Sequence, residues 1–120
     1  MRGHLPLVAM RRRGLLPTSV FILADGCEDT LRQWSDWHQF EPRIPHVEID
    51  PRTDSPARLD LRFLRGVPLV HVWTDGEHRE HGIALMHACV DHGVGRVFGA
   101  VLHDVNDPSL TETFDTRVSA

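Results

Sequence analysis

The sequence predicts an α/β domain: a four-stranded mixed sheet flanked by helices, with extensions at both ends. Three observations predict this class: a continuous apolar run at residues 19–24, an alternating segment at residues 46–50, and helical patterns between and after these strands. A chain of 120 residues has room for one hydrophobic core. We therefore expect residues 1–120 to form one domain, with a core at about residues 19–93 and a C-terminal extension at residues 94–120.

Composition and charge exclude several classes of protein. Hydrophobic residues make up 41% of the chain and charged residues 25%, which is ordinary for a globular domain and argues against disorder. The net charge of −4 disfavours binding to nucleic-acid phosphates. No segment approaches the roughly 18–20 consecutive apolar residues of a membrane-spanning helix. We therefore expect neither nucleic acid nor a membrane as a partner.

The cysteine count and the N-terminal segment predict a cytoplasmic protein. Two cysteines cannot form the disulfide framework of a small secreted domain. The short apolar stretch at residues 5–10 is interrupted by three arginines at residues 11–13, so it is a poor secretory signal. These arginines could contact an anion or an acidic partner, although three basic residues near a terminus are usually solvated.

The first predicted elements are a helix and a buried strand. Residues 5–13 suit a short helix that ends at Gly14, with a short strand as the alternative. Pro17 and Thr18 interrupt the chain before the apolar run of residues 19–24. Because that run contains branched and aromatic residues and is bounded by turn residues, it predicts a strand buried on both faces.

A helix is predicted after a turn at residues 25–27. Glu28 and Asp29 favour a helix start, because acidic side chains stabilise the positive end of the helix dipole. The helix should end near Phe40, before two prolines. The side chains expected to face the core are Leu31, Trp34, Trp37 and His38.

A second strand and a second helix are predicted in the middle of the chain. Residues 46–50 alternate apolar and polar side chains, which is typical of a strand. Pro56 suits the first position of a helix, and Gly66 would end it. The side chains expected to face the core are Leu59, Phe63 and Leu64.

A hairpin and a final helix are predicted next. Strands at residues 69–73 and 78–81 flank the Asp75-Gly76 dipeptide, which suits a tight primed turn. The final helix is expected at residues 83–92, with Gly93 as its stop. Its apolar stripe comprises Ile83, Met86, Cys89 and Val90.

This order of elements, together with three local sequences, resembles the thioredoxin fold over roughly residues 19–93. The three sequences are Phe21-Ile-Leu-Ala-Asp-Gly-Cys-Glu-Asp-Thr30, Val47-Glu-Ile-Asp50, and Leu64-Arg-Gly-Val-Pro-Leu69 followed by Trp73-Thr-Asp-Gly-Glu77. The resemblance implies a thioredoxin-like fold, with Cys27 at the first cysteine of the family's Cys-x-x-Cys motif and Thr30 at the second. It also implies a cis bond between Val67 and Pro68.

The resemblance implies a thiol-dependent redox site. A cysteine just before a helix is favoured as the thiolate, because unpaired backbone N–H groups and the helix dipole point at its sulfur. Cys27 would therefore be the nucleophile toward a protein or small-thiol disulfide, and Thr30 would donate a hydrogen bond to its thiolate. The backbone of Val67 and Pro68 would hold the substrate. No cofactor is expected beyond an external thiol such as glutathione.

Departures from the family pattern leave a second hypothesis open. Thr30 replaces the resolving cysteine, and Cys89 is expected on an apolar helix face, where a cysteine is commonly a small hydrophobe. Glu28 and Asp29 place negative charge beside Cys27 and oppose thiolate formation. The chain is therefore either a redox protein with one active cysteine or a redox-inactive interaction or assembly module.

The histidines and an apolar C-terminal segment also bear on function. The nine histidines do not predict a metal site, because His78 and His81 would fall on opposite faces of a strand. The apolar segment at residues 96–102 is too hydrophobic to be a solvated tail. We expect this segment to be ordered against the sheet edge or at a homodimer contact.

Overall fold

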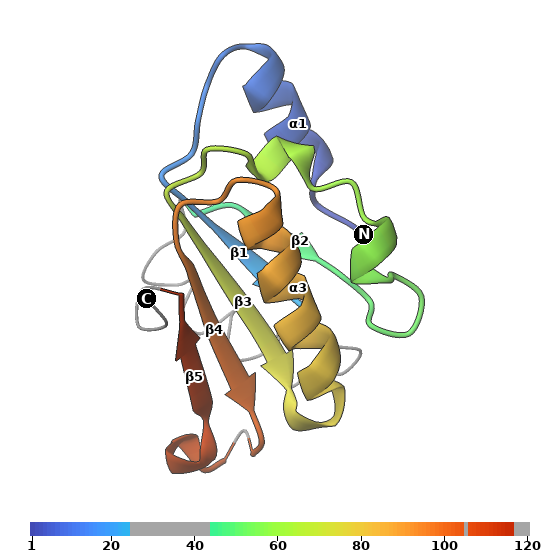
Figure 1. Cartoon of the computed structure of the whole chain (residues 1–120), viewed down its shortest axis with the longest axis vertical. Helices are drawn as coiled ribbons and strands as arrows, with labels where there is room; N and C mark the ends of the chain where they lie inside the picture. Colours follow the sequence, from blue (N-terminus) through green and yellow to red (C-terminus); the bar gives the residue numbers. More distant parts are fainter. Residues whose placement is uncertain (25–43, 105, 117–120) are drawn as a thin grey trace.

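The computed structural model describes residues 1–24, 44–104 and 106–116. These residues form a five-stranded mixed sheet with helices, so the predicted α/β class is confirmed (Figure 1). The strands are β1 (Ser19–Leu23), β2 (His46–Glu48), β3 (Leu69–Asp75), β4 (Val97–Leu102) and β5 (Glu112–Asp115). The α-helices are α1 (Leu5–Arg12) and α3 (Arg79–Asp91), and the 3-10 helices are η1 (Pro56–Arg58), η2 (Arg62–Leu64), η3 (Gly76–His78) and η4 (Pro108–Leu110).

The sheet has the order β2-β1-β3-β4-β5. β1 pairs in parallel with both β2 and β3, with Ser19 opposite Leu69, and β3 pairs in parallel with β4, with Val70 opposite Val97. Only β5 runs antiparallel to its neighbour β4. The expected four strands are therefore too few, and the thioredoxin-like arrangement is not confirmed.

The main core lies on one face of the sheet. Figure 1 shows α3 lying over β3 and β4, with α1 on the same face near the amino ends of the strands. Val20 and Ile22 of β1 face this side, and Leu7 of α1 and Leu85 of α3 pack into the same cluster. The opposite face carries a smaller cluster around Phe21. Burial on both faces is the environment predicted for the apolar run that forms β1.

The N-terminal helix is confirmed and its strand alternative is wrong. α1 is followed by Gly14 with a positive φ of 75°, a conformation that favours glycine after a helix end. Leu7 is buried, whereas Leu5 is 69% exposed. Neither α1 nor any other described helix is long and apolar enough to cross a membrane.

The predicted hairpin after residue 69 is wrong. β3 continues to Asp75 and leads through η3 directly into α3, so residues 78–81 are helical. A primed turn needs positive φ at its central residues, and Gly76 does not have it. The final helix consequently begins at Arg79, and it ends before Gly93, as predicted.

The predicted helix after Pro56 is replaced by the two short turns η1 and η2. The backbone is extended at Leu59, with φ −75° and ψ 136°, which separates them. The Asp60 carboxylate accepts a hydrogen bond from the Arg62 backbone N–H at 3.2 Å, a local bond that competes with helix formation. Phe63 is still buried, so the predicted core contact is formed without the helix.

The apolar C-terminal segment is a central strand. Residues 97–102 form β4, which pairs with β3 on one side and β5 on the other. The expectation that this segment is ordered and buried is confirmed, and the segment lies against β3 inside the sheet and not at its outer edge. The alternative of a homodimer contact stays a prediction. Both of its edges are hydrogen-bonded within the chain, because the polar segment that follows folds back as β5. The turn, helix and site residues predicted within residues 25–43 lie outside the described part of the chain.

Candidate functional site

Half of the predicted redox site can be placed. Cys27 and Thr30 lie outside the described residues, whereas Val67 and Pro68 immediately precede β3. Val67 is buried and Pro68 is exposed. The described residues contain no cis peptide bond, so the expected cis bond before Pro68 is wrong and the bond has the ordinary trans form.

The direction of β3 places Val67 and Pro68 at the opposite edge of the sheet from the end of β1. In an antiparallel pair, the residue before the second strand lies beside the residue after the first. β1 and β3 are parallel instead, so Pro68 lies at the amino edge of the sheet and Ala24 at the carboxyl edge. Five residues of strand at about 3.3 Å each put roughly 16 Å between these edges. The described residues therefore do not bring Val67 and Pro68 toward the end of β1 that leads to Cys27.

Cys89 is a core residue and not a resolving thiol. Its side chain is fully buried in the main cluster beneath α3. Burial raises the pKa of the Cys89 thiol to about 12, because the charged thiolate is poorly solvated there. Since thiolate is the species that attacks disulfides, Cys89 is unsuited to thiol–disulfide exchange.

The carboxyl edge of the sheet carries a small acidic cluster at the end of β3. His78 Nδ1 lies 2.8 Å from Asp75 Oδ1, and both side chains are partly buried. Asp75, Glu77 and His78 each offer one potential metal ligand, and these atoms lie within 4.8 Å of one another. His78 and Asp75 are paired with each other in this cluster. The expectation that the protein has no metal site stays a prediction.

A second polar network closes the same edge beside β4 and β5. Arg79 Nε donates to Glu112 Oε1 at 3.0 Å, and His103 Nε2 lies 2.5 Å from the same oxygen. These hydrogen bonds lower the pKa of Glu112, with the largest effect from Arg79. The network joins α3 to β5, because the Glu112 carboxylate is paired with both Arg79 and His103.

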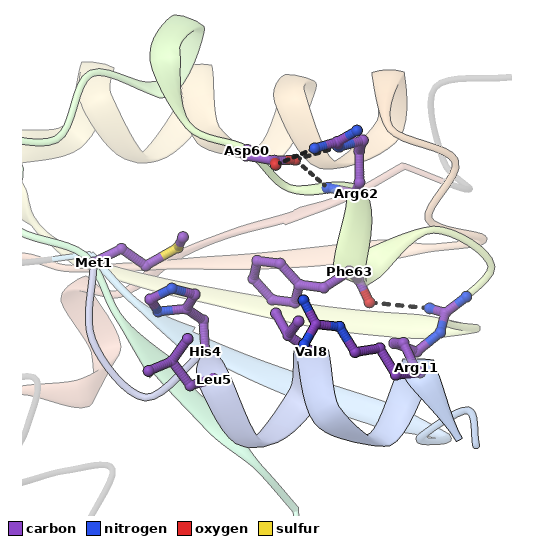
Figure 2. Close-up of a pocket in the computed structure, with 9 residues that line it drawn as sticks. Met1, His4, Leu5, Val8, Arg11, Asp60, Arg62 and Phe63 are labelled. Carbon is purple, nitrogen blue, oxygen red and sulfur yellow. Dashed lines mark hydrogen bonds and ion pairs between the residues drawn. The ribbon is translucent and has the colours of Figure 1, made fainter. Parts of the chain in front are cut away.

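A pocket of about 510 Å³ lies between α1 and η2. Figure 2 shows Phe63 and Arg62 on the η2 side, across from His4, Leu5 and Val8 of the N-terminal segment. The volume is within the 300–1,000 Å³ range of small-molecule sites. The complete lining is Met1, His4, Leu5, Val8, Arg11, Arg12, Asp60, Arg62 and Phe63.

The walls of this pocket are held by interactions between distant segments. Nη1 of Arg11 donates to the carbonyl oxygen of Phe63 at 3.0 Å and to that of Arg65 at 2.6 Å, which ties α1 to η2. The His4 ring lies 6.0 Å from the Phe63 ring in a tilted arrangement. Among the described residues, the buried Nδ1 of His4 has no hydrogen-bond partner.

Sequence reasoning missed this pocket. It drew attention to the arginines at residues 11–13, but not to Leu5, Val8 or Arg62 as residues of a shared site. The signal available in the sequence was a short predicted helix at residues 5–13 that carries both leucines and arginines. The pocket forms because η2 packs beside α1. These segments are far apart in the sequence, and no local pattern predicts that they are in contact.

No model of a known protein family matches this sequence, and no curated protein matches it.

Proposed function

We propose that this chain is a ligand-binding module that takes a small apolar or amphipathic molecule between α1 and η2. This proposal is separate from the interaction or assembly module expected from the sequence, whose partner would be another protein. The observation that carries it is the pocket itself: about 510 Å³, with Leu5 69% exposed over it and Val8 and Phe63 lining it. An apolar ligand there would cover surface that is otherwise in water, at about 25 cal/mol per Å² of apolar area.

The chemistry of the lining supports binding in preference to catalysis. The described residues around the pocket include no serine, threonine, cysteine or lysine that could act as a nucleophile. Nη1 of Arg11 is engaged by two backbone carbonyls, so this side chain builds the wall. Asp60 is paired with Arg62, which donates to it from Nε at 2.9 Å. The arrangement therefore favours recognition of a ligand's shape and charge.

Fluorescence titration with phenylnaphthylamine, a neutral apolar probe, tests the proposal. We expect saturable binding that Leu5→Gln weakens several-fold. Leu15→Gln is the matched control, because Leu15 is also about half exposed, at 52%, but does not line the pocket. Failure of the probe to saturate, or equal effects of the two substitutions, would contradict the proposal.

We propose as a second candidate function thiol–disulfide exchange by Cys27 alone, with Thr30 as hydrogen-bond donor and glutathione as the external thiol. Its support is the position of Cys27 shortly after a buried strand and before a predicted helix. Because Cys89 is buried and its thiol pKa is raised, such chemistry would use the thiol of Cys27 alone. This proposal does not depend on Val67 or Pro68.

The pH dependence of alkylation tests this second candidate. A thiol pKa for Cys27 well below the free-cysteine value of about 8.5 supports it, and Cys27→Ser should then abolish glutathione-dependent disulfide reduction. A normal or raised thiol pKa, or reductase activity retained in Cys27→Ser, would eliminate it. Cys27→Ser also serves as the background control, because it leaves Cys89 as the remaining cysteine of the two in the chain.

A further inference from the structure

The pocket between α1 and η2 is positively charged in a negatively charged chain. Its lining contains the three arginines Arg11, Arg12 and Arg62 and the single carboxylate of Asp60, so the side chains that line it carry a net charge of +2 with His4 neutral. The whole chain carries −4. The local charge is thus opposite in sign to the overall charge, which concentrates the positive potential at this pocket.

The arginine of η2 is already neutralised. Arg62 donates to Asp60 from Nε at 2.9 Å and from Nη2 at 2.7 Å, in a two-pronged ion pair. This pairing lowers the pKa of Asp60 to about 2, so its carboxylate stays ionised at neutral pH. An anionic ligand therefore gains little from this side of the pocket.

The arginines of α1 keep donors that a ligand can use. Both hydrogen bonds of Arg11 are made by Nη1, and a guanidinium has five N–H donors in all. Arg12 is exposed, lines the pocket and forms no ion pair with another described residue. A carboxylate or sulfonate over the last turn of α1 would therefore be recognised by Arg12, next to the fixed guanidinium of Arg11.

We infer that the ligand of this pocket is a small amphipathic organic anion, whose acidic group pairs with Arg12 and whose apolar body lies on Leu5, Val8 and Phe63. The inference rests on the proposed binding function and adds the chemical class of the ligand. Leu5, Val8 and Arg12 lie along α1, and Phe63 of η2 lies across from them, so a single molecule can contact all four. The size of the pocket suits a small molecule.

Two probes with the same apolar body test the inference: anilinonaphthalene sulfonate, an anion, and phenylnaphthylamine, its neutral counterpart. We expect the sulfonate to bind about tenfold more tightly at low salt, as a charge-assisted hydrogen bond implies, and the preference to shrink as salt is added. Arg12→Gln should remove the preference, so that the two probes bind this variant with similar affinity. Arg13→Gln is the matched control, because the adjacent Arg13 is also exposed but does not line the pocket, and it should keep the preference.

The outcomes separate this inference from the function on which it rests. Saturable binding of both probes with equal affinity would overturn the inference and leave the binding function in place. Absence of saturable binding for either probe would overturn both. Loss of the preference in Arg13→Gln as well as in Arg12→Gln would also overturn the inference, because general surface charge would then explain it.

Discussion

At the residue scale, a glycine allows α3 to lie close against the sheet. A Cβ on Gly82 would overlap Cγ2 of Thr74 in β3. Thr74 cannot easily move away, because it is fully buried and its hydroxyl donates to the carbonyl oxygen of Ala24 at 2.7 Å. The pair therefore fixes how closely α3 approaches β3, while Thr74 also joins the ends of β1 and β3.

Gly82→Ala should destabilise the protein by about 1–3 kcal/mol through overpacking, although alanine favours a helix by about 1 kcal/mol. Urea unfolding measures the change. Adding Thr74→Ser, which removes the methyl group and keeps the hydroxyl, should recover part of the loss, whereas His87→Ala on the exposed side of α3 is the control. A Gly82→Ala protein as stable as the original would show that α3 is not limited by this contact.

A histidine is held among aromatic rings on the other face of the sheet. The His71 ring stacks on Phe21, with 4.5 Å between ring centroids and 8° between ring planes, and meets the edge of Phe98 at 6.0 Å. Burial lowers the pKa of His71, and the positive charge of Arg96 adds to the effect. Protonating His71 therefore opposes the folded state.

This depressed pKa predicts a loss of stability in mildly acidic solution. Below the unfolded-state pKa of about 6.5, the unfolded chain binds a proton that the folded chain resists, so the free energy of unfolding falls as pH falls toward the folded-state pKa. Comparing urea unfolding at pH 7.5 and pH 5 measures the slope. His71→Phe should reduce it, and an unchanged slope in His71→Phe would refute the assignment.

At the element scale, β4 completes the sheet. It pairs in parallel with all but the first residue of β3, and its residues Val97 and Val101 are fully buried. β5 then covers its other edge, and Arg96 is paired with Asp115 beside it. β4 is therefore part of the core, and β5 covers its outer edge.

Deleting residues 95–120 should unfold the chain, because it exposes the hydrogen-bonding edge of β3 and removes core side chains worth about 1.5–3 kcal/mol each. Circular dichroism and light scattering should show lost structure or aggregation. Val101→Asp should act in the same direction, and Thr113→Asp, at an exposed position of β5, should be tolerated. A truncated protein that stayed folded and equally stable would contradict the central role of β4.

At the scale of the whole molecule, ion pairs connect segments that are distant in sequence. The Met1 amino group pairs with Asp54 at 2.8 Å, which links the first residue to the loop after β2. Arg79 pairs with Glu112, which links α3 to β5. Both carboxylates have pKa values below their ordinary range because of these hydrogen bonds.

These pairs predict acid sensitivity. A carboxylate whose pKa is lowered in the folded state stabilises that state above its unfolded-state pKa of about 4, and the contribution is lost as pH falls through the lower folded-state value. The urea midpoint should therefore fall between pH 5 and pH 3. Glu112→Gln should have a lower midpoint at pH 5 and a smaller fall on acidification; a fall as large as that of the original chain would exclude Glu112 as a contributor.

Local patterns predicted the parts of the fold that depend on neighbouring residues. The apolar run became β1, the alternating segment became the shorter β2, and glycines followed the ends of α1 and α3. Each of these features follows from side-chain periodicity or from the positive φ that glycine tolerates. The burial of residues 97–102 was also predictable, because an apolar segment gains by leaving water wherever it packs.

Only the tertiary structure decided how these elements pair. Alternation along residues 69–75 specifies a strand but neither the direction of that strand nor its neighbours. The Asp75-Gly76 dipeptide is compatible with the start of a helix as well as with a hairpin turn. The parallel direction of β3 placed Pro68 at the far edge from Ala24, and the packing of η2 on α1 created the pocket. The sequence by itself thus determined which segments are buried and which form helices or strands, because those preferences are local. Strand direction and the pocket were decided by the tertiary structure, because they depend on contacts between residues that are far apart in the chain.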